Sequence, residues 1–155
     1  MRASLLAIVI ALAACTSSVP RAPSVSEARV VLDEVIEAGL ARDWERLCAN
    51  ASGTCEGELA GWEHLAPSEF PRVADVSVQE PARDGDGWRS GGVLFVLCGT
   101  DATGTPYKSE VLVFDDGDRL LAGAAVYWIG TRVSFASSDG AVTPGERVAG
   151  GTRCT

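Results

Sequence analysis

Val93-Leu94-Phe95-Val96-Leu97 is an uninterrupted apolar run, and it decides the fold class of this 155-residue chain. A short apolar run between turn residues is typical of a β-strand covered on both faces, and we expect that strand to span Trp88–Gly99. Asp84-Gly85-Asp86-Gly87 precedes it and Asp101–Thr105 follows it, and both segments favour tight turns. The chain is therefore expected to reverse direction at both ends of the strand.

Three further strands are expected around this run. The first carries Val73, Val76 and Val78 and ends at Pro81; the next spans Tyr107–Phe114; the last spans Arg119–Gly130. Because tight turns join the segments, the strands should form an antiparallel meander.

Helices are expected before the sheet. Ser24 and Glu27 have the spacing of a capping box, and apolar residues then recur on one helical face up to Leu40. Asp43 is placed to cap a second, shorter helix through Trp44, and a third helical segment is expected over Glu56–His64. Helices followed by a meander predict an α+β domain, with N-terminal helices packed on one face of an antiparallel sheet of about four strands.

The N-terminus has the features of an export signal. Arg2 precedes the apolar block Leu5–Leu12, and Leu12-Ala13-Ala14-Cys15 resembles the lipobox of bacterial lipoproteins, whose cysteine is acylated and becomes the mature N-terminus. The alternative is an ordinary secretory signal cut after Ala13, which leaves Cys15 as a free thiol. The block is too short for a retained transmembrane helix, which needs about 20 apolar residues. We therefore expect an extracytoplasmic protein held on the cell membrane by its lipid.

This reading divides the chain into four parts. Residues 1–14 are the signal peptide, 15–23 the lipidated cysteine and a tether, 24–130 the α+β domain, and 131–155 a tail rich in Gly, Ser and Thr.

Four cysteines remain after Cys15, namely Cys48, Cys55, Cys98 and Cys154. An even number in an oxidising compartment indicates disulfides, and three pairings are possible. The short separation of Cys48 and Cys55 favours their pairing, which leaves Cys98 for Cys154. The second bridge would pin the end of the tail.

The charge balance restricts the partners. The chain has 13 basic and 21 acidic residues, and loss of Arg2 with the signal brings the mature net charge from −8 to about −9. Binding to nucleic acid or to an anionic lipid surface would need a basic patch, so neither is expected.

Several short strings resemble a known superfamily. They are Asp43-Trp44, Leu47-Cys48, Val96-Leu97-Cys98-Gly99-Thr100-Asp101, Gly104-Thr105-Pro106-Tyr107 and Val126-Tyr127-Trp128. In this order, over Val25–Gly130, they resemble small actinobacterial secreted proteins and lipoproteins of the nuclear transport factor two-like, or cystatin-like, superfamily. The resemblance implies a curved sheet wrapped around a long helix to form a cone. The hollow of such a cone is a ligand pocket in some relatives and an active site in the ketosteroid isomerases.

Aromatic residues are the candidate pocket walls: Trp44, Tyr107 and Trp128. Because Tyr127 and Trp128 are adjacent on an expected strand, only one of them should face the interior.

Catalysis in the cone would need a carboxylate base and a second acid or phenol, and the candidates are Asp75, Asp101, Glu110, Tyr107, Tyr127 and His64. No motif joins them, so no catalytic residue is assigned. Asp101 is expected to hydrogen-bond the backbone of its own turn.

Metal ions and cofactors are not expected. The aspartates at 84, 86, 115, 116 and 118 lack the glutamate that completes a calcium loop, and they fit turns better. The cysteine spacing does not suit zinc.

The sequence thus predicts a non-catalytic cell-envelope lipoprotein that binds a small apolar ligand or, preferentially, a neighbouring envelope protein. The alternative is a ketosteroid-isomerase-like enzyme acting on a small apolar substrate. The resemblance also implies that two copies could pair through an exposed sheet.

Overall fold

The structure is a computed structural model that describes residues 21–53, 55–84, 87–89, 91–133, 142–143 and 154. The predicted signal peptide, Cys15, the first part of the tether and most of the tail lie outside these residues. No helix in the described part of the chain is both long enough and apolar enough to cross a membrane.

Four helical elements precede the sheet: α1 (Val25–Ala41), α2 (Trp44–Ala49), α3 (Cys55–Leu59) and the 3-10 turn η1 (Glu63–Leu65). The predicted capping box begins α1, since the Glu27 N–H donates to Ser24 Oγ at 3.3 Å and the Ser24 N–H donates to Glu27 Oε2 at 2.9 Å. Arg42 ends the helix in the left-handed conformation, with φ of 56°. The expected third helix is divided into α3 and η1, because Gly61 adopts a φ of 91° between them.

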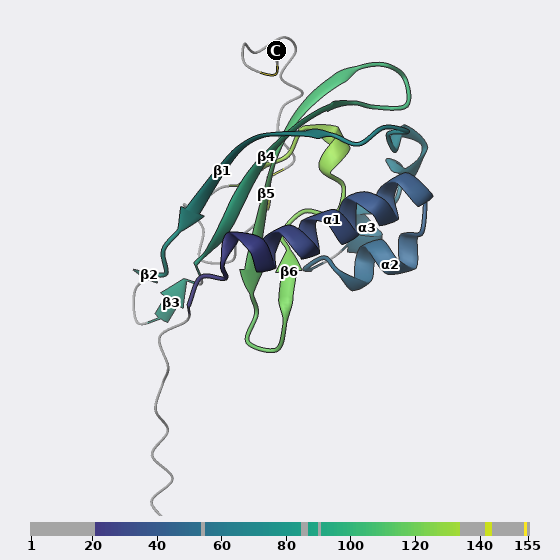
Figure 1. Cartoon of the computed structure of the whole chain (residues 1–155). Helices are drawn as coiled ribbons and strands as arrows, with labels where there is room; N and C mark the ends of the chain where they lie inside the picture. The colour runs from purple at the N-terminus through teal and green to yellow at the C-terminus, as the bar shows by residue number, and fades with distance from the viewer. Residues whose placement is uncertain are drawn as a thin grey trace, which may run out of the picture.

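An antiparallel sheet of four strands has the order β1 (Arg72–Gln79), β4 (Gly92–Thr100), β5 (Pro106–Asp115) and β6 (Leu120–Ala122), as Figure 1 shows. The fold class is therefore α+β, as predicted. Two small hairpins lie outside this sheet: β2 (Ala82–Asp84) with β3 (Gly87–Arg89), and β7 (Arg132–Val133) with β8 (Val142–Thr143). Trp88 belongs to the first hairpin, so the central strand begins at Gly92 and not at Trp88.

The core lies between α1 and the sheet. Val93, Phe95 and Leu97 of β4 are fully buried, and α1 contributes Leu32, Val35 and Ile36 to the same cluster. Leu94 and Val96 point to the opposite face and are only half-buried. The prediction that both faces of this strand are covered is therefore only half correct, because the described helices pack on one face.

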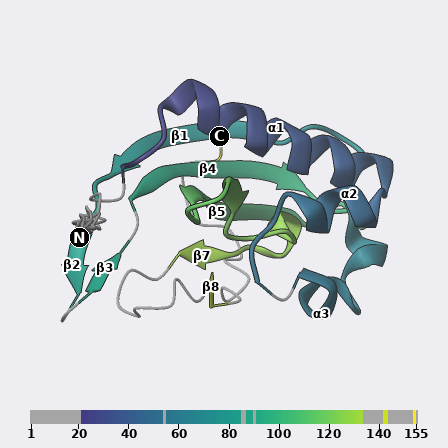
Figure 2. The ribbon, with the colours of Figure 1, turned by 90° about the horizontal axis from the view of Figure 1, so that it is seen from below.

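Figure 2 shows α1 running along the sheet, with α2 and α3 at its C-terminal end and the β2–β3 hairpin at its N-terminal end. The chain thus enters the domain at one end of α1, and the helical hairpin that follows lies at the other. A helix of 17 residues is about 25 Å long at 1.5 Å per residue.

The predicted strand over Arg119–Gly130 is wrong beyond Ala122. β6 ends there, and Tyr127–Ile129 forms a 3-10 turn, η2. Both Tyr127 and Trp128 are buried, so the expectation that they face opposite sides is wrong as well. The reason is tertiary: Gly39 of α1 leaves room for both rings, and a Cβ there would lie 3.1 Å from the Tyr127 hydroxyl and 3.2 Å from the Trp128 ring.

Two disulfides close the structure, and they are the pairs that the spacing favours. Cys48 and Cys55 join α2 to α3 with 5.4 Å between their Cα atoms, and Cys98 and Cys154 join β4 to the tail with 5.6 Å. On the chain-entropy account, the short loop contributes about 2.5 kcal/mol and the long one about 4 kcal/mol. Cys98 points away from α1, so Cys154 is tied to the face of the sheet opposite α1.

Candidate functional site: the α2–α3 groove

The interior, where the resemblance places a ligand pocket, is filled by side chains. Phe95, Tyr127 and Trp128 are among the large residues that are fully buried. The void that Tyr107 and Trp128 both line has a volume of only about 10 Å³. Ligand pockets for small organic molecules measure about 300–1,000 Å³. This void therefore does not accommodate an apolar substrate.

The aromatic residues predicted as pocket walls pack against one another or against Tyr127. Ring centroids are 6.1 Å apart for Tyr107 and Tyr127, 5.1 Å for Tyr127 and Trp128, and 6.2 Å for Trp128 and Trp44. The chain of rings therefore runs from the core to the surface, where Trp44 is half-exposed. It ends at a groove on the outside of the helical hairpin.

This groove, which we call the α2–α3 groove, has a volume of about 630 Å³ and is open to solvent. Its lining comes from three elements: Trp44, Glu45, Cys48 and Ala49 from α2; Glu56, Leu59 and Ala60 from α3 and its end; and Glu63 from η1. We call the larger apolar residues of this lining, Trp44, Cys48 and Leu59, the floor of the groove. Three carboxylates contribute the charge.

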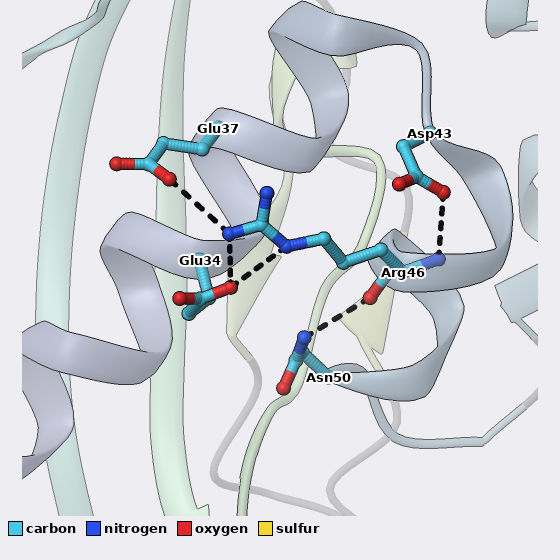
Figure 3. A network of polar contacts seen from close by, with 5 residues as sticks. All are labelled: Glu34, Glu37, Asp43, Arg46 and Asn50. Atoms are coloured by element: carbon cyan, nitrogen blue, oxygen red, sulfur yellow. Dashed lines mark hydrogen bonds and ion pairs between the residues drawn. The ribbon is translucent and has the colours of Figure 1, made fainter.

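Local interactions hold α2 in place beside α1. Asp43 Oδ1 accepts from the Arg46 N–H at 3.1 Å and so caps α2. The Arg46 guanidinium reaches back to α1, where Nε donates to Glu34 Oε2 at 2.8 Å and Nη2 contacts both Glu34 and Glu37 (Figure 3). Asn50 Nδ2 donates to the Arg46 carbonyl at 3.0 Å. The α2 wall is thus fixed to the long helix.

The other wall is fixed to α2 and to the core. The Cys48–Cys55 disulfide joins the start of α3 to α2. Beyond α3, the Trp62 carbonyl accepts from Trp128 Nε1 at 2.9 Å, and the Leu65 carbonyl accepts from the Ala102 N–H at 3.1 Å. Both walls of the groove are therefore tied to the folded domain.

The groove is negatively charged at neutral pH. The backbone N–H of Glu63 and that of Gly61, which donates at 2.8 Å, hold the pKa of the Glu63 carboxyl below its usual value. None of the residues that line the groove is basic. Arg46 lies on the same helix as Glu45, but contacts with Glu34 and then Glu37 raise its pKa and direct its charge toward α1. The three carboxylates therefore have no basic neighbour in the groove lining.

The six candidate catalytic residues do not form a site. Asp101 is buried and accepts from the N–H groups of Thr103 and Thr105 at 2.9 and 3.0 Å, so it serves its turn as predicted. Asp75 and His64 are exposed on different elements. Glu110 accepts from the Val133 N–H at 3.1 Å.

The two tyrosines among the candidate catalytic residues are buried in the core. Burial is the main cause that raises the pKa of both Tyr107 and Tyr127, with neighbouring Tyr127 and Asp101 adding to the shift of Tyr107. Both phenols are therefore neutral at physiological pH and are poor general bases.

In the aspartate-rich turns, carboxylates accept hydrogen bonds from backbone N–H groups. Asp115 Oδ1 accepts from the Gly117 N–H, and Asp116 Oδ1 accepts from the N–H groups of Asp118 and Arg119. Asp86 lies outside the described residues. Within the part of the chain that the structure describes, no group of His, Cys, Asp and Glu is arranged to hold a metal ion.

Comparison with protein-family models, with curated proteins and with solved structures finds no match. The resemblance to the nuclear transport factor two-like superfamily therefore stays a prediction.

The groove itself was only partly accessible to sequence reasoning. The sequence predicts Trp44 as a pocket residue and favours the Cys48–Cys55 bridge, but it does not identify Glu45, Glu56 and Glu63 as site residues. The signal that could have found them is the disulfide, since it brings the segments on either side of residues 49–54 together.

Proposed function

We propose that this chain is a lipid-anchored protein of the bacterial cell envelope that binds a neighbouring envelope protein through the α2–α3 groove, without catalysing a reaction. One observation carries the proposal: the described domain has an open groove with an apolar floor on its surface, whereas the void lined by Tyr107 and Trp128 measures about 10 Å³. An apolar floor of this kind is typical of a recognition site.

The extracytoplasmic location draws support from the disulfides. Bonds of this kind persist in oxidising compartments and are rare in the cytosol of mesophiles. The lipobox-like Leu12-Ala13-Ala14-Cys15 supplies the anchor in this proposal. A thioether-linked diacylglycerol provides two acyl chains, which is enough for stable attachment.

The position of the groove favours a protein partner over the bilayer. The tether joins the domain at the start of α1, and α2 and α3, which line the groove, lie at the opposite end of that helix (Figures 1 and 2), about 25 Å away by helix geometry. The net charge of the chain is −8, which opposes contact with anionic lipid. In this proposal the groove faces material above the membrane surface.

The isomerase alternative gains no support from the site. Tyr107 and Asp101, which would have to act together on a substrate, border a void too small for one, and the Asp101 carboxylate is occupied by its own turn.

The anchor is tested by labelling cells with an alkyne analogue of palmitate and separating membrane from soluble fractions. The wild-type chain should be labelled and should sediment with membrane, and Cys15→Ser should lose both properties. An unlabelled wild-type chain in the soluble fraction would refute the anchor.

The groove is tested by placing a photo-crosslinking amino acid at Ala60, which is exposed and lines the groove, and at Ser77, which is exposed on β1. Irradiation of living cells should give an adduct with a different protein at position 60 and none with a different protein at position 77, where a second copy of this chain is the only expected neighbour. A second substitution, Ala49→Tyr, fills the groove without adding charge and should abolish the adduct. An adduct that persists in this variant, or none at all, would contradict the proposal.

A further inference from the structure

The lining of the α2–α3 groove narrows the class of partner, and this step rests on the proposed function. We propose that the groove receives a basic amphipathic segment of a partner protein, in which Lys or Arg side chains flank an aliphatic or aromatic anchor.

The anchor is inferred from the floor. Trp44 is half-exposed, Leu59 and Cys48 line the same groove, and the Cys48–Cys55 disulfide joins the two helices. An apolar side chain placed here removes apolar surface from water on both partners, which favours association. At about 630 Å³, the groove has room for more than one such side chain.

The charge of the segment is inferred from the carboxylates. Glu45, Glu56 and Glu63 come from three different elements and are all exposed in the free protein. A neutral or acidic segment that entered the groove would partly desolvate them without a counter-charge, which is unfavourable. Lys or Arg side chains next to the anchor would instead form charge-assisted hydrogen bonds with them.

The one basic residue on α2, Arg46, does not supply the counter-charge for these carboxylates. Arg46 is held on the opposite side of α2 by Glu34 and Glu37 of α1 (Figure 3). Across Arg42–Leu65 there are five acidic residues and two basic ones, so the whole hairpin carries a negative charge. Complementary charge raises the rate of association and disfavours acidic competitors.

The test selects from a random library of displayed 12-residue peptides on the immobilised mature chain, with Cys15→Ser to remove the lipid. Clones that also bind the Ala49→Tyr variant are discarded, so that only groove-dependent peptides remain. We expect these peptides to carry two or more Lys or Arg residues beside an aliphatic or aromatic residue. Their dissociation constants, measured by isothermal titration calorimetry, should rise at least tenfold in the triple variant Glu45→Gln, Glu56→Gln, Glu63→Gln.

A matched control removes three negative charges elsewhere. The variant Glu69→Gln, Asp75→Asn, Glu80→Gln changes exposed residues outside the groove and should alter binding less than threefold. If the control weakens binding as much as the groove variant, the effect is one of net charge and the inference is wrong.

The possible failures are distinguishable. Groove-dependent peptides without basic residues would overturn the inference and leave the proposed function standing. If no peptide depends on the groove, the proposed function itself fails. Spermine carries positive charge without an apolar anchor, so spermine binding as tight as the selected peptides would show that the occupant is a free polycation, and the inference would again be wrong.

Discussion

Replacing Tyr107 by Phe is expected to stabilise the protein, although it removes a polar group from a packed core. The Tyr107 side chain is 7% exposed, and its hydroxyl has no hydrogen-bond partner among the described residues. Gly99 faces this hydroxyl, and a Cβ there would lie 2.6 Å from the oxygen, so glycine is what gives the ring room. The hydroxyl was desolvated on folding without a replacement bond.

The magnitude follows from two opposing terms. A buried hydroxyl without a partner costs about 1–3 kcal/mol. Removing the oxygen enlarges the neighbouring void of about 10 Å³ by roughly the volume of one atom, which costs a few tenths of a kcal/mol at about 24 cal/mol per Å³. The net expectation is a gain of about 1 kcal/mol, or about 3 °C in the midpoint of thermal unfolding.

Tyr127→Phe is the matched control, because its ring packs against that of Tyr107 with centroids 6.1 Å apart. The Tyr127 hydroxyl donates to the Ile36 carbonyl at 3.4 Å, so the control loses a bond and should be destabilised by about 0.5–1 kcal/mol. Urea denaturation with both disulfides intact measures the two changes. A loss of stability in Tyr107→Phe would refute the reasoning, since it would mean that the hydroxyl has a partner after all, such as a bound water.

The same two variants test how the stability of the protein depends on pH. Burial raises the pKa of both phenols above the ordinary value of about 10, so the folded state retains protons that the unfolded chain releases. Stability is thus fully present below about pH 10 and falls as pH rises above it, by up to about 1.4 kcal/mol per pH unit for each phenol. Each Tyr→Phe variant should lose stability less steeply between pH 10 and 11, and an unchanged slope would contradict the burial of that ring.

Three other predictions concern the ends and edges of the fold. Ser24→Ala removes the N-cap of α1 and should cost about 1 kcal/mol in urea denaturation, with a loss under 0.3 kcal/mol arguing against the cap. Replacing Cys48 and Cys55 together by Ser should cost about 2.5 kcal/mol in the same assay, and an unchanged midpoint would mean that the bridge does not form. Val76 and Val78 are 39% and 48% exposed on β1, an edge strand of the four-stranded sheet, so we expect two copies to pair along it. Val76→Lys should shift sedimentation equilibrium toward monomer, and a wild-type chain that is monomeric at every concentration would refute this pairing.

Sequence patterns were sufficient wherever local chemistry determines structure. Ser24 and Glu27 fixed the start of α1, because both halves of a capping box lie within one turn. The Val93–Leu97 run identified β4, because turn residues flank it. The Cys48–Cys55 bridge followed from its short separation, and the second bridge then followed because only one pair was left.

Sequence patterns failed where contacts between residues far apart in the sequence determine the structure. Val126-Tyr127-Trp128-Ile129 is apolar throughout, and such a run is equally compatible with a strand and with a buried 3-10 turn. The turn packs against Gly39, where a Cβ would lie 3.1 Å from the Tyr127 hydroxyl and 3.2 Å from the Trp128 ring, yet Gly39 lies 88 positions before Tyr127 in the sequence. The acidic side of the groove was missed for a similar reason, because single glutamates on short helices look like solvated surface residues until three elements bring them together.

The misread turn and the missed groove are linked physically. Gly39 admits the Tyr127 and Trp128 rings against α1, the Trp128 ring packs on Trp44 with centroids 6.2 Å apart, and Trp44 lines the groove. Trp128 Nε1 also donates to the Trp62 carbonyl, one residue before Glu63 on the opposite wall. One buried side chain therefore contacts Trp44 on one side of the groove and the residue before Glu63 on the other. Because packed cores resist small displacements, a change that moves Trp128 should alter the shape of the groove as well as the stability of the domain.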